Sequence, residues 1–194
     1  MTVFRDLSQH ILDIVENSIT AGATLVYLDI VEDPAANQMV IAVRDNGRGM
    51  APEMLIQVAD PWVTTRTTRK VGLGIPFLKQ TAEMCGGNFK VESKPRHGAL
   101  IQATFALDHI DRPPLGDLIG TLLCIVVGNS QLDLVYDHRV GEQAFTFRTR
   151  EIRDILGADV PLSDPDVLGF IRNALAEGLS SIESRAGVDV KAGH

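Results

Sequence analysis

Apolar residues recur on one helical stripe near the start of the chain. Between residues 6 and 20 this stripe consists of Leu7, Ile11, Ile14, Val15 and Ile19. The spacing is that of an amphipathic helix with one buried face. Gly22 follows closely, where helices commonly stop. We therefore predict a helix over residues 6–20.

The next segments alternate between strand-like and helix-like patterns. Residues 24–32 and 38–44 are rich in β-branched side chains and are separated by a Pro-Ala-Ala-Asn turn, which is typical of paired strands. The elements expected after this pair are a helix over 52–59, a helix over 75–85, and strands over 88–94 and 99–107. Helices alternating with strand pairs predict an α+β fold, a two-layer sandwich whose strands meet in one mostly antiparallel sheet.

A boundary is predicted after residue 110. Adjacent prolines at positions 113 and 114 remove two backbone donors and favour extended chain, so a regular element should end there. We expect a first domain over 1–110 and a small α+β C-terminal domain over 111–194. The elements expected in the second are strands over 119–128, 132–137 and 143–148, a helix over 149–156, and a helix from Pro165 to about residue 185 capped by Ser163.

Bulk composition is that of an ordinary globular protein. Of 194 residues, 45% are hydrophobic and 22% are charged, which is usual for a folded domain. No apolar run approaches the ~18 residues of a membrane span, and the N-terminus lacks a signal-peptide pattern, so we expect a cytoplasmic protein. Cys85 and Cys124 fit no metal or redox spacing and are expected to be buried free thiols.

Net charge is −7 and is distributed unevenly. Residues 1–110 hold 10 Lys and Arg against 12 Asp and Glu, a net of −2, and residues 111–194 hold 8 against 13, a net of −5. Broad binding to nucleic acid or to an anionic membrane needs a basic surface, so neither is expected. A local anion site remains compatible with these numbers.

Three polar side chains share one face of the first predicted helix. His10, Asp13 and Asn17 are spaced i, i+3 and i+7, opposite the apolar stripe. Such a face is commonly no more than the solvated side of a helix. It becomes a candidate site only in combination with other segments.

Two glycine-containing segments follow at regular spacing. Residues 45–50 read Asp-Asn-Gly-Arg-Gly-Met, which is a common turn signal but also lets backbone approach a flat ligand beside a carboxylate. Residues 72–74 read Gly-Leu-Gly at the start of a helix, after the basic stretch 64–70. Amide groups at a helix N-terminus attract anions, although a flexible basic turn is the alternative. Asn17, Asp45 and Gly72 are separated by nearly equal intervals.

Taken together, these segments resemble the GHKL family of ATPases, which includes histidine kinases, type II topoisomerases and mismatch-repair ATPases. HILDIVENSITAGAT resembles the N box, DNGRGM the first glycine box and VGLGIPFLK the second. GGNFKVESKPRHGALIQATF resembles the hairpin that closes the same domain. The likeness covers residues 6–107 and implies a Bergerat ATP-binding fold that takes ATP or ADP with Mg²⁺.

The resemblance implies a role for each matching residue. Asn17 would be the Mg²⁺ ligand, and Asp45 would accept a hydrogen bond from the adenine amino group. Gly47 and Gly49 would shape the base pocket, and Met50 would pack against the adenine. A lid over 51–71 would order around the phosphates, whose expected contacts are Gly72, Leu73, Gly74, Arg66, Arg69 and Lys70.

The chain departs from the family at the catalytic position. Four residues before the N-box asparagine, hydrolysing members and anti-sigma-factor kinases have glutamate, and many histidine kinases have asparagine; here the residue is Asp13. A carboxylate is kept, so Asp13 is the candidate general base, but it is one methylene shorter. Since a shift of about 1 Å in a catalytic group can cost on the order of 100-fold, we expect slow turnover. Glu16 is the weaker candidate because it lies off the common face.

Other family features are missing. Nine residues precede His10, too few for the phospho-accepting hairpin of histidine kinases, so we expect no autophosphorylation of that kind and a structural or phosphate-side role for His10. The tail has no counterpart of the phosphate-sensing lysine, since Lys191 is its only lysine. We therefore expect an ATP-dependent regulator that hydrolyses slowly or phosphorylates a partner protein. The alternatives are a non-catalytic ATP/ADP switch and a scaffold without nucleotide, and a homodimer is possible in each case.

Overall fold

The computed structural model describes residues 6–58, 74–157 and 160–182. The elements of its first part are α1 (Leu7–Thr20), β1 (Leu25–Asp33), β2 (Gln38–Asp45), α2 (Pro52–Val58), α3 (Gly74–Met84), β3 (Asn88–Ser93) and β4 (Ala99–Ala106). Each predicted helix and strand of this part is confirmed to within one residue at either end. Those of the second part are α4 (Leu118–Gly128), β5 (Asp133–Val140), β6 (Gln143–Arg148), α5 (Thr149–Leu156) and α6 (Pro165–Ser181).

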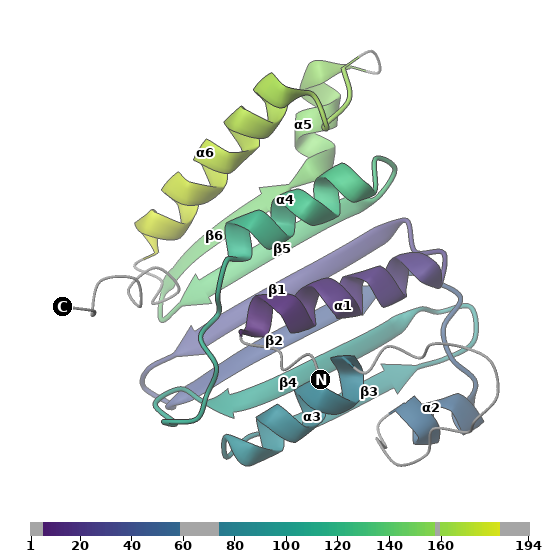
Figure 1. The fold of residues 1–194 in the computed structure, drawn as a ribbon, viewed down its shortest axis with the longest axis vertical. Helices are drawn as coiled ribbons and strands as arrows, with labels where there is room; N and C mark the ends of the chain where they lie inside the picture. The colour runs from purple at the N-terminus through teal and green to yellow at the C-terminus, as the bar shows by residue number, and fades with distance from the viewer. Residues whose placement is uncertain (1–5, 59–73, 158–159, 183–194) are drawn as a thin grey trace.

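The strands form one sheet in the order β3-β4-β2-β1-β5-β6. Neighbouring strands are antiparallel except for β1 and β5, which are parallel. Helices α1, α3 and α4 lie side by side over one face of this sheet (Figure 1). Burial alternates strictly along β1, with Leu28 fully buried and Tyr27 only partly buried, because successive side chains point to opposite faces. The predicted two-layer α+β architecture is confirmed.

The strand predicted over 119–128 is wrong, because this segment is the helix α4. The side chain of Asp117 accepts a hydrogen bond of 2.8 Å from the amide of Gly120 and so caps the first turn. Buried side chains recur at Leu118, Leu122 and Ile125, a helical spacing, as α4 packs against α1 and α6. The run includes β-branched residues, but 11 residues are long for a strand and sufficient for a buried helix.

Replacing the cap of α4 tests this assignment. Asp117→Ala should lower the free energy of unfolding by about 1 kcal/mol, because the amide of Gly120 loses its acceptor. Denaturant unfolding of the variant measures the change. Asp154→Ala, which removes an exposed carboxylate on α5, is the matched control. It should leave stability within about 0.5 kcal/mol of wild type. Equal midpoints for both variants would refute the capping role.

Two smaller predictions in the tail also need correction. The residue that caps α6 is Asp164 and not Ser163, since the Asp164 carboxylate accepts from the amide of Asp166 at 2.9 Å. Pro165 is the first helical residue, as predicted. Cys85 is buried as expected, but Cys124 is exposed on α4. None of the described helices is both long enough and apolar enough to cross a membrane.

The tail strands extend the sheet of the first part. Strand β5 pairs with β1, and the amides of Leu7 and Ser8 donate to the carbonyls of Pro114 and Leu115, both at 2.9 Å. The hydrophobic core contains side chains from both sides of residue 110. The division into two domains at that residue stays a prediction, but the two parts share one sheet and one core.

A buried polar chain crosses from β1 to β5. The hydroxyl of Tyr136 lies 2.7 Å from Nδ1 of His138, whose Nε2 lies 2.9 Å from Oε1 of Glu32. All three side chains are at most 3% exposed, and burial raises the pKa of Tyr136 well above its usual value. Buried polar groups are costly unless they are hydrogen-bonded, so this chain favours the native register of β5 on β1.

Candidate functional site

The polar face of α1 contains buried polar atoms that have no hydrogen-bond partner among the described residues. Helix α1 begins at the cap Asp6, whose carboxylate accepts from the amide of Gln9 at 3.1 Å, as capping residues do. Farther along the helix, Oδ2 of Asp13 and Nδ2 of Asn17 are buried and hydrogen-bond to nothing in the part of the chain that the structure describes. Buried polar atoms are nearly always paired in folded proteins, so these two atoms are the candidates on this face for contacts with a group outside the described residues.

The N-terminus of α3 lies directly against this face. A Cβ atom at Gly74 would overlap the carboxylate of Asp13, so the approach of the two helices requires glycine at that position. His10 is buried and hydrogen-bonds to the backbone of Gly74, while burial lowers the pKa of its imidazole. The arrangement brings the carboxylate of Asp13 against the first residue of α3, one helical turn from the side chain of Asn17.

Asp45 ends β2 and turns its carboxylate toward α1. Its Oδ2 accepts a hydrogen bond of 2.9 Å from the hydroxyl of Ser18, and its Oδ1 accepts one of 2.8 Å from the amide of Gly47. Ser18 is 4% exposed, so the contact is largely shielded from water. Each carboxylate oxygen keeps a lone pair beyond these bonds, and Asp45 can therefore accept from a further donor.

The loop after β2 interlocks with the turn between β3 and β4. Gly49 has a φ of +65° and Gly98 a φ of +71°, values that glycine adopts readily. A Cβ atom at either would overlap a carbonyl group, that of Lys94 or of Asp45 respectively. The amide of Met50 donates to the hydroxyl of Ser93 at 2.8 Å, and this hydroxyl donates to the carbonyl of Gly98 at 2.6 Å. These contacts connect the loop after β2 to the turn between β3 and β4.

Asn46 fixes the same loop to the start of β1. Its Oδ1 accepts from the amides of Thr24 and Leu25 at 2.8 and 3.0 Å, and its Nδ2 donates to the hydroxyl of Thr24 at 2.9 Å. The side chain of Asn46 thus satisfies the amides of Thr24 and Leu25 at the point where the strand pairing ends. The role of Asn46 is therefore structural, and Asp45 is the candidate ligand-binding acceptor of this segment.

The structure brings some of the predicted site residues together, places others apart, and does not describe the rest. Asp13, Asn17 and Gly74 come together between α1 and α3, and Asp45 and Gly47 join them through Ser18. Met50 is partly buried against the core, while Glu16, the weaker base candidate, is exposed. The predicted residues that lie outside the described part of the chain are Arg66, Arg69, Lys70, Gly72 and Leu73.

Sequence reasoning missed Ser18 and Ser93. Ser18 directly follows Asn17, and one residue on a helix turns by about 100°, so it was not expected on the same face. The sequence does contain a signal for Ser18, because a serine on the buried side of a helix is unusual unless its hydroxyl has a hydrogen-bond partner. Ser93 lies at the end of a strand and no pattern in the sequence distinguishes it.

The model of the family described as "Histidine kinase-, DNA gyrase B-, and HSP90-like ATPase" matches residues 2–109, more than half of the chain. The fold and the site thus define a GHKL-type ATP-binding domain, and the chain belongs to this family. ATP binding follows from that membership. The predicted family and its Bergerat-type fold are confirmed.

Curated relatives are similar over part of their length. The chain is 27% identical over 126 residues to the non-motile and phage-resistance protein of Caulobacter vibrioides, covering 60% of this chain and 15% of that protein. It is 31% identical over 101 residues to sporulation kinase C of Bacillus subtilis, covering 52% of this chain and 23% of the kinase. The chain therefore spans about a quarter or less of the length of these relatives.

The chain is also similar to solved structures. The Aquifex aeolicus MutL ATPase domain complexed with ADP has a TM-score of 0.49 at 13% identity, with 88% of each chain covered. The histidine kinase domain of the E. coli osmosensor EnvZ has a TM-score of 0.38 at 24% identity, covering 52% of this chain and 65% of that one.

Proposed function

We propose that this protein is an Mg²⁺-dependent ATP-binding regulator that hydrolyses ATP slowly or transfers its terminal phosphoryl group to a partner protein. The observation behind the proposal is a pair of buried atoms beside the N-terminus of α3, Oδ2 of Asp13 and Nδ2 of Asn17, which have no partner among the described residues. Polar atoms left unpaired in a protein interior cost about 1–3 kcal/mol each. A phosphate oxygen would accept a hydrogen bond from Nδ2 of Asn17, and a water or hydroxyl beside the terminal phosphate would donate one to Oδ2 of Asp13.

The adenine end of the nucleotide would lie against Asp45. Its carboxylate is an acceptor at the end of a strand, oriented by Ser18 and Gly47, and an exocyclic amino group is a donor. Gly47 and Gly49 would allow backbone to approach the flat base, and Met50 would supply an apolar contact. The phosphates would extend toward Gly74, where amide groups and the helix dipole favour negative charge.

The residues present fit a magnesium ion. Asn17 offers a side-chain amide whose oxygen suits a hard cation, and Mg²⁺ typically takes one or two protein ligands together with phosphate oxygens and water. Asn17 would hold the ion against the triphosphate. When bound, Mg²⁺ would neutralise charge on the phosphates, a role to which Arg66, Arg69 and Lys70 would add.

Asp13 would act as the general base. Its carboxylate lies on the same face as Asn17 and has an oxygen without a hydrogen-bond partner among the described residues. It could therefore accept a proton from water or from the hydroxyl of a partner protein. The side chain is one methylene shorter than glutamate. A purely binding ATP/ADP switch is the second candidate for this reason.

Calorimetric titration of ATP and ADP, with Mg²⁺ and with a chelator, tests the proposal. We expect micromolar-range binding that weakens when Mg²⁺ is removed. Heat changes that are the same with and without Mg²⁺ would contradict the metal assignment. No ATP binding at millimolar concentration would contradict the function altogether.

Ser18→Ala tests how the adenine acceptor is held. The variant removes the 2.9 Å hydrogen bond to Oδ2 of Asp45 but leaves the carboxylate in place. This bond lies within the protein and is present without nucleotide, so its loss acts on affinity only through the orientation of Asp45. We expect ATP affinity to fall by roughly threefold to tenfold. Ser180→Ala, a change of the same kind at an exposed position on α6, should leave affinity unchanged. If the two variants bind ATP equally well, Ser18 has no part in positioning Asp45.

A further inference from the structure

A cluster of positive charge lies on this acidic protein. It consists of Arg44 at the end of β2, Arg48 in the following loop, and Lys94, Arg96 and His97 in the turn between β3 and β4. All five side chains are exposed. Within the described residues, no carboxylate lies within ion-pair distance of these arginines or of the lysine. We call this set the basic cluster.

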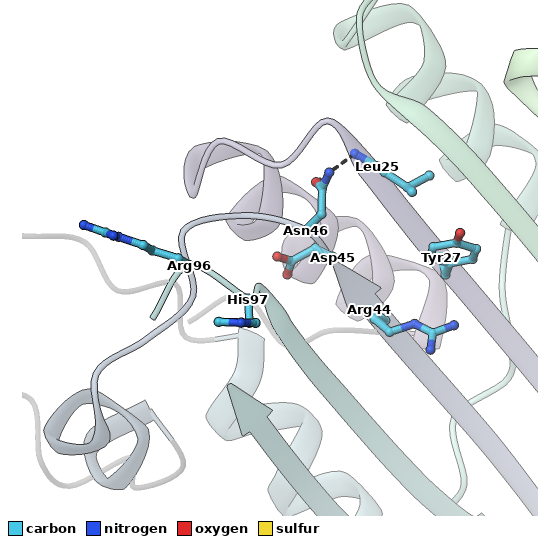
Figure 2. Close-up of a pocket in the computed structure, with 7 residues that line it drawn as sticks. All are labelled: Leu25, Tyr27, Arg44, Asp45, Asn46, Arg96 and His97. Atoms are coloured by element: carbon cyan, nitrogen blue, oxygen red, sulfur yellow. Dashed lines mark hydrogen bonds between the residues drawn. The ribbon is translucent and has the colours of Figure 1, made fainter. Parts of the chain in front are cut away.

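A cavity of about 420 Å³ is lined in part by three residues of the basic cluster, Arg44, Arg96 and His97 (Figure 2). Its lining residues are Leu25, Tyr27, Arg44, Asp45, Asn46, Arg96 and His97. The guanidinium of Arg44 lies 4.7 Å from the centre of the Tyr27 ring, a cation–π contact that restrains its side chain. Leu25 and Tyr27 add apolar surface beside the positive charge, so the cavity combines two kinds of contact.

The cavity opens on the side of the sheet opposite the predicted nucleotide site. Tyr27 and Arg44 are register partners on β1 and β2, and both belong to the less buried side of these strands. The helices that flank the predicted phosphate site, α1 and α3, cover the other face (Figure 1). Asp45 lines the cavity, but its carboxylate turns toward α1, where its Oδ2 accepts from Ser18. A ligand beside Tyr27 and Arg44 therefore lies on the opposite face of the sheet from the expected adenine position.

The turn that contributes Arg96 and His97 is held in an unusual conformation. Arg96 has a φ of +67°, which is uncommon for a residue other than glycine. Its amide donates to the carbonyl of Arg48 at 2.7 Å. The ring nitrogen Nδ1 of His97 lies 2.9 Å from the carbonyl of Pro95. Uncommon backbone dihedral angles persist only where the surrounding structure enforces them, and they are enriched at functional sites.

Counter-charge on the same face is limited. Asp29 is two residues beyond Tyr27 on β1, and burial raises the pKa of its carboxyl, with Asp137 adding to this effect and Arg44 opposing it. Three arginines and a lysine still outnumber the carboxylates of Asp29, its register partner Asp137 and Asp45, and Glu92 on β3 is paired with Lys90. The cluster is positive although the whole chain has a net charge of −7.

We propose that the basic cluster is a docking surface for an acidic segment of a partner protein. Arg44 and Arg96 each hold a carboxylate of that segment, and a neighbouring apolar side chain packs on Leu25 and Tyr27. Guanidinium groups bind carboxylates through paired hydrogen bonds, and opposite charge accelerates encounter. Leu25 adds an aliphatic surface beside the positive charge, which suits an apolar side chain next to a carboxylate and so favours a peptide. The proposal goes beyond the nucleotide site and does not depend on it.

Fluorescence anisotropy with a labelled glutamate-rich peptide containing one leucine tests the proposal on the full chain. We expect binding that weakens as salt is raised, because exposed ion pairs are screened. The double variant Arg44→Glu/Arg96→Glu should lose at least about tenfold in affinity through like-charge repulsion. The milder Arg44→Gln/Arg96→Gln should lose less and provides a second reading if the charge reversal disturbs folding, which circular dichroism detects.

The controls distinguish binding at the basic cluster from non-specific attraction of the peptide to any positive charge on the protein. Arg172→Glu, the same reversal at an exposed position on α6, should bind the peptide as wild type does. A peptide with glutamine in place of glutamate should not bind. Four results would overturn the proposal. They are an equal loss of affinity in the α6 variant, binding of the glutamine peptide, no binding of the acidic peptide, and tighter binding of a single-stranded oligonucleotide.

Discussion

Asp45→Asn should weaken ATP binding about 100-fold. The variant keeps the size of the side chain but replaces a charged acceptor with an amide, and hydrogen bonds to charged groups contribute about 1.5–3 kcal/mol. The new amide nitrogen can also face the adenine amino group, where two donors repel. At about 1.4 kcal/mol per tenfold, the combined loss corresponds to roughly two orders of magnitude.

Titration calorimetry of wild type and Asp45→Asn measures this effect. Asp154→Asn, an exposed change of the same kind on α5, is the matched control and should bind ATP as wild type does. Far-ultraviolet circular dichroism and thermal melting establish that the site variant is folded, since Asp45 also accepts from Ser18 and Gly47. An affinity within threefold of wild type would rule out Asp45 as the group that reads adenine.

The first half of the fold could be predicted because its patterns are local. The apolar stripe of α1 follows a helical period, and its polar face is continuous. Strands β1 and β2 are rich in β-branched residues and lie on either side of a turn. Each of these patterns lies within one element or one turn. This explains why the boundaries found agree with those predicted to within one residue.

The fold of the tail could not be predicted as well, because its secondary structure and strand pairing depend on contacts with residues far away in the sequence. Strand and helix are both compatible with the apolar run of α4, and its burial between α1 and α6 decides between them. The parallel pairing of β5 with β1 joins residues more than a hundred positions apart, and no local pattern encodes it. The chain of Tyr136, His138 and Glu32 that accompanies this pairing is visible only once the strands are adjacent.

The candidate site falls between these cases. Helical spacing places Asp13 and Asn17 on one face, so their proximity could be predicted. The burial of their polar atoms could not, because it depends on where α3 packs, and neither could the bond from Ser18 to Asp45. The glycines at 49 and 98 are required by backbone carbonyls from a different segment, which a sequence does not reveal.

Asp13→Asn should lower the rate of ATP hydrolysis, or of phosphoryl transfer to a partner, about 100- to 10,000-fold while leaving ATP affinity within a few-fold of wild type. General-base catalysis contributes rate factors of this size, and an amide cannot accept the proton. The two side chains are nearly the same size, so the close contact with Gly74 is kept. Loss of rate with retained binding separates a catalytic group from one that only positions the nucleotide.

Steady-state turnover under saturating Mg·ATP, together with calorimetry, makes the measurement, and the chain offers a matched control. Glu16→Gln removes an exposed carboxylate from the same helix and should leave turnover unchanged. Equal rates for wild type and Asp13→Asn, with ATP still bound, would mean that Asp13 is not a base. The protein would then be better described as an ATP/ADP switch, because the buried oxygen of Asp13 would serve binding and not chemistry.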